Sequence, residues 1–181
     1  PLSAEVLETG SQLTLKAPGY KTLQQQVRVK AGSKATHPLI EMIVADGTLT
    51  INSVPQGASI TIDKQFKGTS PMDVAVTPFA KHNIELFLEG YLNTKQSVSV
   101  KPEQQRQISV NLTPNIGRVR LNITPADAAI LVDGKRLGTG SQTLSLNAKP
   151  QSISVEKSGY ETQSMTVTPR PGHQQALTIQ L

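Results

Sequence analysis

Two stretches of the chain share one pattern that decides the fold: VPQGASITIDKQFKGTS at residues 54–70 and TPADAAILVDGKRLGTG at residues 124–140. In each, a proline and an alanine precede two alternating apolar residues, which are followed by an aspartate and a glycine. The matching residues are offset by 70 positions: Pro55 with Pro125, Ala58 with Ala128, Asp63 with Asp133, and Gly68 with Gly138. Self-similarity at a fixed period indicates tandem structural repeats.

A Gly-Tyr dipeptide marks the later part of each repeat. It occurs at Gly19-Tyr20, Gly90-Tyr91 and Gly159-Tyr160, and these three tyrosines are all that the 181 residues contain. The spacing predicts two copies of about 70 residues, at 46–114 and 115–181, joined by short linkers around 44–46 and 114–117. Residues 1–45 then correspond to only the second half of a truncated copy.

Apolar residues alternate with polar ones within each copy. In the middle copy the pattern runs through Leu49 and Ile51, Ile60 and Ile62, and Ile84 and Leu86, among others. A period of two is typical of half-buried strands, and no segment shows helical spacing. Turns such as Asp133-Gly134 favour hairpins. We therefore predict an all-β protein of tandem small antiparallel β-sandwich (Ig-like) domains, with six or seven short strands per complete copy.

Composition narrows the possible functions. The chain is 36% hydrophobic and 17% charged, so it has enough apolar residues for a core, and no run of eighteen apolar residues predicts a membrane span. Aromatic residues are 3% without tryptophan, which argues against a stacking platform for single-stranded nucleic acid. Cysteine is absent, which removes thiolate catalysis and disulfides. Because the sequence begins at Pro1, we expect it to be a fragment.

The order of these motifs resembles the PEGA domain. VPQGA at residues 54–58, ITIDKQFKGTSPM after it and FLEGY at residues 87–91 carry the resemblance, which departs at Gln56, Lys64 and Asp127. PEGA domains are small β-rich modules of bacteria and archaea, often in tandem and often in envelope proteins. The resemblance implies an extracytoplasmic module, periplasmic or at the cell surface, with no catalytic residues to carry over.

The repeated motif residues are expected to be structural. Glycines 57, 68 and 138 are predicted to adopt positive φ in turns, and prolines 55 and 125 to set the entry of a strand. Asp63, Asp133 and Gly134 are expected to form hairpin turns. Each tyrosine is predicted to pack its ring over the core edge and to bond its hydroxyl to the backbone, as in a tyrosine corner. Sugar stacking by Tyr20, Tyr91 and Tyr160 is the less favoured alternative.

No catalytic, cofactor or metal site is predicted. His37, His82 and His173 fall at different places in the repeat and have no partner at metal-ligand spacing, so each is expected to be solvated or to cap a turn. A general-acid role for Asp63 or Asp133 would need a second carboxylate at a matching position, which the sequence does not offer. An enzyme confined to these residues is therefore the third choice of function.

The last copy is the basic one, with seven basic and four acidic residues from 115 to 181. Arg118 and Arg120 alternate with apolar residues, so both are expected on the solvent face of one strand, with Lys135 and Arg136 on a hairpin tip. A solvated face is one interpretation, and binding of an anionic glycan or an acidic partner is the sharper one. Nucleic acid is not expected as a partner, because no groove-reading helix accompanies the charge.

Two functional hypotheses follow. The favoured one is a non-catalytic structural spacer or protein-interaction module of a bacterial cell-envelope protein, whose partner is another protein or a neighbouring domain of the same polypeptide. The alternative is a module that binds cell-wall or surface polysaccharide and targets an attached enzyme domain. Neither requires a cofactor or insertion into a membrane.

The truncated copy makes a separate prediction. It lacks the counterparts of two strands, residues 49–52 and 58–63, so the inward faces of Leu13, Leu15, Val27 and Val29 should be exposed beside an unpaired sheet edge. We expect a neighbouring repeat, a second copy of the chain or an upstream segment to cover them.

Overall fold

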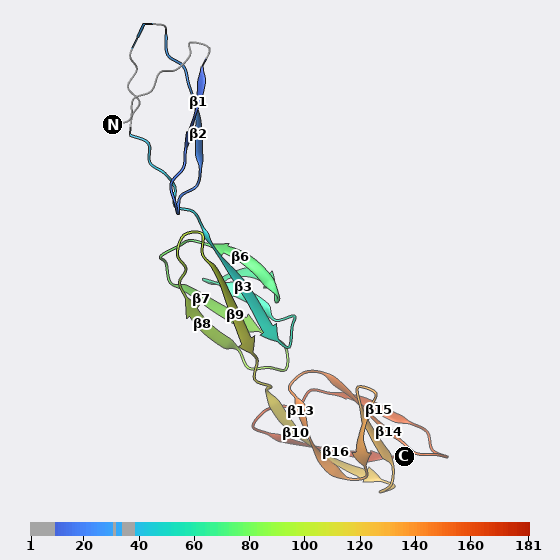
Figure 1. Ribbon diagram of the computed structural model, residues 1–181. Coiled ribbons are helices and arrows are strands. Elements are labelled where there is room, and N and C mark those ends of the chain that lie inside the picture. The colour runs from blue at the N-terminus through green and yellow to red at the C-terminus, as the bar shows by residue number, and fades with distance from the viewer. Residues whose placement is uncertain (1–9, 31, 34–38) are drawn as a thin grey trace.

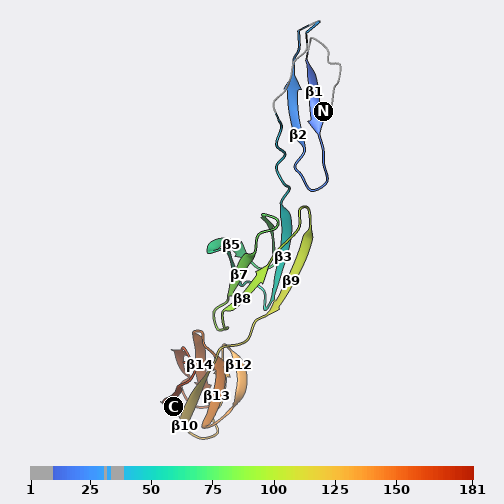
Figure 2. The ribbon, with the colours of Figure 1, turned by 90° about the vertical axis from the view of Figure 1, so that its left-hand side faces the viewer.

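The computed structural model describes residues 10–30, 32–33 and 39–181, and all sixteen regular elements in them are β-strands. Figures 1 and 2 show a hairpin, a middle copy and a last copy that follow one another in a row, so the molecule is elongated. The predicted all-β class is confirmed. Within the described residues no helix is long and apolar enough to cross a membrane.

The middle copy has seven strands in two sheets. The strands are β3 (Gly47–Val54), β4 (Ser59–Ile62), β5 (Gln65–Thr69), β6 (Met72–Val76), β7 (His82–Phe87), β8 (Thr94–Val98) and β9 (Gln105–Asn111). One sheet has the order β6-β3-β9 and the other the order β5-β4-β7-β8. The count matches the predicted six or seven strands per copy.

The last copy repeats this arrangement. Its strands are β10 (Ile116–Thr124), β11 (Ala129–Val132), β12 (Lys135–Thr139), β13 (Gln142–Asn147), β14 (Gln151–Glu156), β15 (Gln163–Val167) and β16 (Gln174–Gln180). The sheets have the orders β13-β10-β16 and β12-β11-β14-β15. One feature differs from the predicted antiparallel sandwich, because β3 pairs with β9 and β10 with β16 in parallel. Hydrophobic alternation sets which face of a strand is buried but not its direction, so the sequence could not show this.

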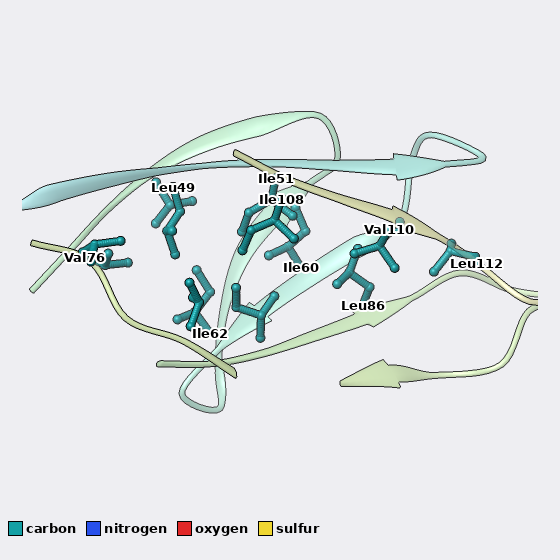
Figure 3. Close-up of a cluster of buried hydrophobic side chains, with 14 residues drawn as sticks. Leu49, Ile51, Ile60, Ile62, Val76, Leu86, Ile108, Val110 and Leu112 are labelled. Carbon is teal, nitrogen blue, oxygen red and sulfur yellow. The ribbon is translucent and has the colours of Figure 1, made fainter. Parts of the chain in front are cut away.

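The alternating apolar residues form the core of each copy. In the middle copy Leu49 and Ile51 of the three-stranded sheet face Ile60, Ile62 and Leu86 of the four-stranded sheet (Figure 3). All five side chains are buried, and burial of a large aliphatic side chain contributes about 1.5–3 kcal/mol. A separate cluster, built on Val119, Leu121 and Ile130, fills the last copy.

The repeated motif builds the turns of each sandwich. Ala58 and Ala128 are fully buried at the start of the second strand. Gly57 has a φ of 89°, as expected for a turn glycine, and Gly68 has a φ of 147° at the bulge between β4 and β5. Gly138 is not among the positive-φ residues, so that prediction is wrong. A Cβ there would lie 2.5 Å from Nε2 of Gln142, the end of a flexible side chain.

Pro55 and Pro125 each follow the first strand of a copy through a cis peptide bond. Both therefore lie in the connection that carries the chain from one sheet to the other, ahead of β4 and β11.

The first unit is a two-stranded hairpin of β1 (Ser11–Leu15) and β2 (Leu23–Val27). Leu13, Leu15, Val27 and Val29 are half-buried, whereas their counterparts in the middle copy, such as Ile84 and Val98, are buried. The remaining residues of the truncated copy, 1–9, 31 and 34–38, lie outside the described residues. That a neighbouring repeat, a second copy of the chain or an upstream segment covers these four side chains stays a prediction.

Candidate functional site: the junctions between copies

The first junction is made by the Gly-Tyr turn that follows β1. Tyr20 forms an isolated antiparallel bridge with Val44 of the linker. The backbone N–H of Lys21 donates to the carbonyl of Ile43 at 2.8 Å, and the N–H of Ala45 donates to the carbonyl of Gly19 at 2.9 Å. The linker that leads into β3 is therefore hydrogen-bonded to the turn of the preceding unit.

The second junction repeats these bonds at the equivalent positions. Tyr91 bridges Pro114, the N–H of Leu92 donates to the carbonyl of Thr113 at 2.9 Å, and the N–H of Asn115 donates to the carbonyl of Gly90 at 2.9 Å. Backbone bonds of this kind fix the direction in which the chain leaves one copy, because a paired peptide group can no longer turn freely about the φ and ψ bonds on either side of it. The Gly-Tyr dipeptide thus marks the point where a copy holds its own outgoing linker.

The copy that follows each junction adds contacts of its own, to the turn at the first junction and to the linker at the second. At the first junction the N–H of Gly19 lies 3.3 Å from Oε2 of Glu103, and Lys21 forms an ion pair of 2.8 Å with Asp46. At the second junction the N–H of Ala148 donates to the carbonyl of Asn115 at 2.7 Å.

The two junction glycines have a positive φ, 79° at Gly19 and 84° at Gly90. A Cβ on Gly19 would lie 3.2 Å from Pro102, and one on Gly90 would lie 3.3 Å from the Cβ of Asn147. Both positions therefore favour glycine, for conformation and for close approach.

The tyrosine-corner prediction is wrong in its hydrogen bond. Within the described part of the chain no tyrosine hydroxyl is hydrogen-bonded, and the bond that defines each turn runs instead from the tyrosine N–H to the carbonyl three residues earlier. Tyr91 is half-buried against the middle core, whereas Tyr20 and Tyr160 are 42% and 48% exposed. The third turn, Gly159-Tyr160, places the Tyr160 ring 5.2 Å from the ammonium of Lys157.

The two hairpin aspartates each accept a backbone bond. Oδ1 of Asp63 accepts from the N–H of Asn83, and Oδ1 of Asp133 accepts from the N–H of Ser152, both at 2.8 Å. Each carboxylate thereby ties the turn after the second strand to the fifth strand of its copy. Asp133 and Gly134 form the predicted two-residue turn, and Lys64 occupies the glycine's place in the middle copy.

Of the two roles expected for His82, solvated or capping a turn, the solvated one is wrong, because the side chain is only 8% exposed. Its Nδ1 lies 2.7 Å from Oδ2 of Asp63, and its Nε2 lies 2.8 Å from the carbonyl oxygen of Thr77. Both neighbours are acceptors, so both ring nitrogens must carry a proton for both bonds to form. The last copy has the buried Gln151 at this place, which donates to the carbonyl of Asn147.

The same contacts shift both pKa values. The Thr77 carbonyl, and after it Asp63, raise the pKa of His82 above its ordinary value despite burial of the ring. The N–H of Asn83, and after it His82, lower the pKa of Asp63. Both shifts favour the charged forms, an imidazolium beside a carboxylate.

The other candidates separate in space. His173 is exposed and His37 lies outside the described residues. Among the described residues no three His, Asp or Glu side chains gather as a metal site. Arg118 and Arg120 project from β10 in the three-stranded sheet, whereas Lys135 and Arg136 belong to the β11–β12 hairpin of the other sheet. The four basic residues that the sequence grouped as one face therefore belong to two.

Sequence reasoning missed a repeated glycine at the start of each copy. Gly47 and Gly117 are buried at the first positions of the copies, where a Cβ would lie 2.5 Å from Val100 and 2.7 Å from the backbone of Pro169, respectively. Their offset of 70 residues was the signal that could have found them.

No curated protein sequence matches the chain. Among solved structures, the Bacillus anthracis TIE protein is similar at 14% identity with a TM-score of 0.48, covering 95% of this chain and 42% of that one. A Streptococcal ancillary pilin is similar at 12% identity with a TM-score of 0.34, covering 92% of this chain and 73% of that one. The chain spans less than half the length of the TIE protein structure.

The PEGA domain matches residues 46–116 and again residues 116–181, so the second boundary falls at Ile116, where β10 begins. The two matches cover well over half of the chain and coincide with the two seven-stranded sandwiches. The chain therefore belongs to the PEGA domain family and carries two complete copies in tandem.

Proposed function

We propose that the chain is a non-catalytic spacer in a bacterial surface protein, in which tandem PEGA copies hold other parts of the polypeptide, or a protein partner, at a fixed distance. The observation that carries the proposal is the repetition of the same hydrogen bonds at both junctions. The N–H groups of Ala45 and Asn115 donate to the carbonyls of Gly19 and Gly90, each at 2.9 Å. A flexible tether would not need a linker paired with the preceding turn.

The bonding of the His82–Asp63 pair supports a non-catalytic role. A general base needs a free lone pair within reach of a substrate. Both nitrogens of His82 instead face acceptors of the same copy, and one oxygen of Asp63 accepts the N–H of Asn83. We propose an extracytoplasmic location for the module, in keeping with the envelope proteins in which tandem PEGA copies are typical.

Small-angle X-ray scattering tests the spacer. The whole chain should scatter as one elongated particle, and inserting Gly-Ser-Gly between Thr113 and Pro114 should require an ensemble of copy orientations to fit the data. The control places the same insertion between Glu161 and Thr162, two exposed residues of the β14–β15 connection at the end of the last copy opposite the 114–117 linker, and should leave the curve unchanged. A native chain that scatters like the junction variant would contradict the proposal.

A further inference from the structure

The outer face of the sheet β13-β10-β16 differs in charge from its counterpart in the middle copy. Arg118 and Arg120 project from the central strand β10, while Val119 and Leu121 between and beside them are fully buried. Residues two apart on a strand lie on the same side, about 6.7 Å from each other. The two guanidinium groups therefore form a short cationic row on the middle of a sheet face.

No acidic side chain balances this row. The strands β10, β13 and β16 contain no Asp or Glu. The ion pairs among the described residues are Lys21–Asp46, Asp63–His82, Glu85–Lys95 and Asp127–Lys157. Neither arginine of β10 takes part in any of them, so both charges are available to an external anion.

The neighbours of the row are small or uncharged. Arg118 pairs with Ser145 of β13 and Gln174 of β16, and Arg120 pairs with Thr143 of β13 and Ala176 of β16. A groove of about 380 Å³ adjoins the Arg118 end and is lined by Ile116, Arg118, Gly172, His173 and Gln174. The face thus combines guanidinium forks with hydroxyl and amide groups and presents no aromatic ring.

The middle copy provides a natural contrast at the same positions. Thr48 and Thr50 stand where the last copy has its two arginines, and Asp73 stands where it has Thr143. The hydroxyl of Thr50 donates to Oδ1 of Asp73 at 2.6 Å. The same sheet face is therefore anionic in one copy and cationic in the other.

We propose that the Arg118/Arg120 face binds an anionic polysaccharide. A guanidinium group pairs with carboxylate or phosphate through two parallel hydrogen bonds. The flanking hydroxyl and amide side chains suit the hydroxyl groups between the charges of a sugar chain. A tight protein interface would need an apolar centre, and single-stranded nucleic acid would need aromatic rings on which its bases stack. This face has little apolar surface and no aromatic ring.

The test uses the whole chain and two polymers, polygalacturonate for carboxylate and poly(glycerol phosphate) for phosphodiester, with neutral dextran as the blank and poly-glutamate as a protein-like polyanion. Biolayer interferometry at about 0.15 M salt gives the affinities. Retention of at least one of the two polymers, with weaker binding of poly-glutamate and none of dextran, is the expected result. The preferred polymer tells whether carboxylate or phosphate is the ligand.

Three variants locate the site. Arg118→Ser with Arg120→Ser should weaken binding about tenfold or more, as loss of charge-assisted bonds does. Lys135→Ser with Arg136→Ser removes the same charge from the other sheet and should change the affinity less than about threefold. Thr48→Arg, Thr50→Arg and Asp73→Thr together should build a second site and raise the number of binding sites per chain.

Several outcomes would overturn the proposal. Equal losses of affinity in the two double variants would show that net charge alone drives binding. Binding of poly-glutamate as tight as that of the charged sugar polymer, or no retention of either charged polymer, would also contradict it. Unchanged thermal unfolding of the Arg118→Ser, Arg120→Ser variant separates loss of the site from loss of the fold. Failure here leaves the spacer intact, because its scattering curve does not depend on these side chains.

Discussion

The middle and last copies share one fold but fill equivalent buried places differently. The middle copy buries Ser53 beside Ser70, whose hydroxyls are hydrogen-bonded, and the last copy has Ile123 and Gly140 at those places. A second example is His82 of the middle copy, whose equivalent in the last copy is the buried Gln151. The fold therefore depends on the alternating apolar residues and the motif turns, whereas a few polar interior places vary if every polar group finds a partner.

The largest effect is expected where the copies agree. Replacing Gly117 by Ala should destabilise the last copy by about 3 kcal/mol, because the added Cβ meets the backbone of Pro169 and Arg170 at 2.7 Å. The equivalent Gly47→Ala should cost somewhat less, since two of the three atoms nearest to its Cβ belong to the Val100 side chain and one, the Lys101 carbonyl oxygen at 2.9 Å, to the backbone. Hydrogen exchange read separately in β3 and β10 measures both. Equal and negligible changes would contradict the prediction, because they would show that a Cβ fits at both glycines.

The next largest difference in stability is expected between tyrosine substitutions in the two complete copies. Tyr91→Ala should cost about 2 kcal/mol, roughly half the loss for a fully buried ring, because the Tyr91 ring is half-buried against the middle core. Tyr160→Ala should cost well under 1 kcal/mol, since that ring is 48% exposed. Tyr91→Phe should be nearly neutral because its hydroxyl has no partner. A large loss for Tyr91→Phe in a urea titration would restore the hydrogen-bonded corner.

Because of the buried His82, the stability of the middle copy, but not of the last copy, should depend on pH near neutrality. Its raised pKa means that the folded state holds the proton more tightly than the unfolded chain. This contribution is complete below about pH 6.5, the ordinary value for His, and is lost as pH rises through the folded pKa. The lowered pKa of Asp63 adds stability above its own ordinary range, which is lost as pH falls through its folded pKa.

His82→Gln, which copies the last repeat, should therefore cost about 1.5 kcal/mol at pH 6, the lower end for a hydrogen bond to a charged group. The cost should shrink at pH 9. Gln151→His should gain a similar pH dependence, because Asp133 and the carbonyl of Asn147 stand at the places of Asp63 and the carbonyl of Thr77. NMR titration of the His82 ring gives the pKa directly, and a value at or below the ordinary one would contradict the doubly protonated ring.

The smallest effect concerns the hairpin tips. Lys64 has a φ of 67° where Gly134 has a φ of 78°, and a residue with a side chain is strained in this region. Lys64→Gly should stabilise the middle copy by about 1 kcal/mol or less, and Gly134→Lys should destabilise the last copy by a similar amount. Denaturant midpoints of the two variants provide the check. Changes of the same sign in both would rule out turn conformation as the cause.

Much of this architecture was predictable from the sequence. The 70-residue offset and the period of two identified the copies, their strands and their core, because both follow from what each strand buries. The parallel pairing of β3 with β9 was not predictable, since alternation is the same for either direction. The environment of His82 was also hidden, because Asp63 and Thr77 reach it only through the pairing of β4 with β7 and the turn before β7.

The junctions show the same limit. The Gly-Tyr dipeptides were visible as a repeat, and their hydroxyls suggested a corner. Their backbone bridges to Val44 and Pro114 involve linker residues with no motif of their own. The sequence thus located the turns but did not show what they hold.

The distance between the copies tests the central claim most directly. The chain contains no cysteine, so Ser109→Cys on β9 and Thr166→Cys on β15 give two unique, exposed sites for spin labels. Double electron–electron resonance should give one narrow distance distribution, set by the labels themselves, and a Gly-Ser-Gly insertion between Thr113 and Pro114 should broaden it. A distribution as broad in the native chain as in the insertion variant would contradict a rigid spacer.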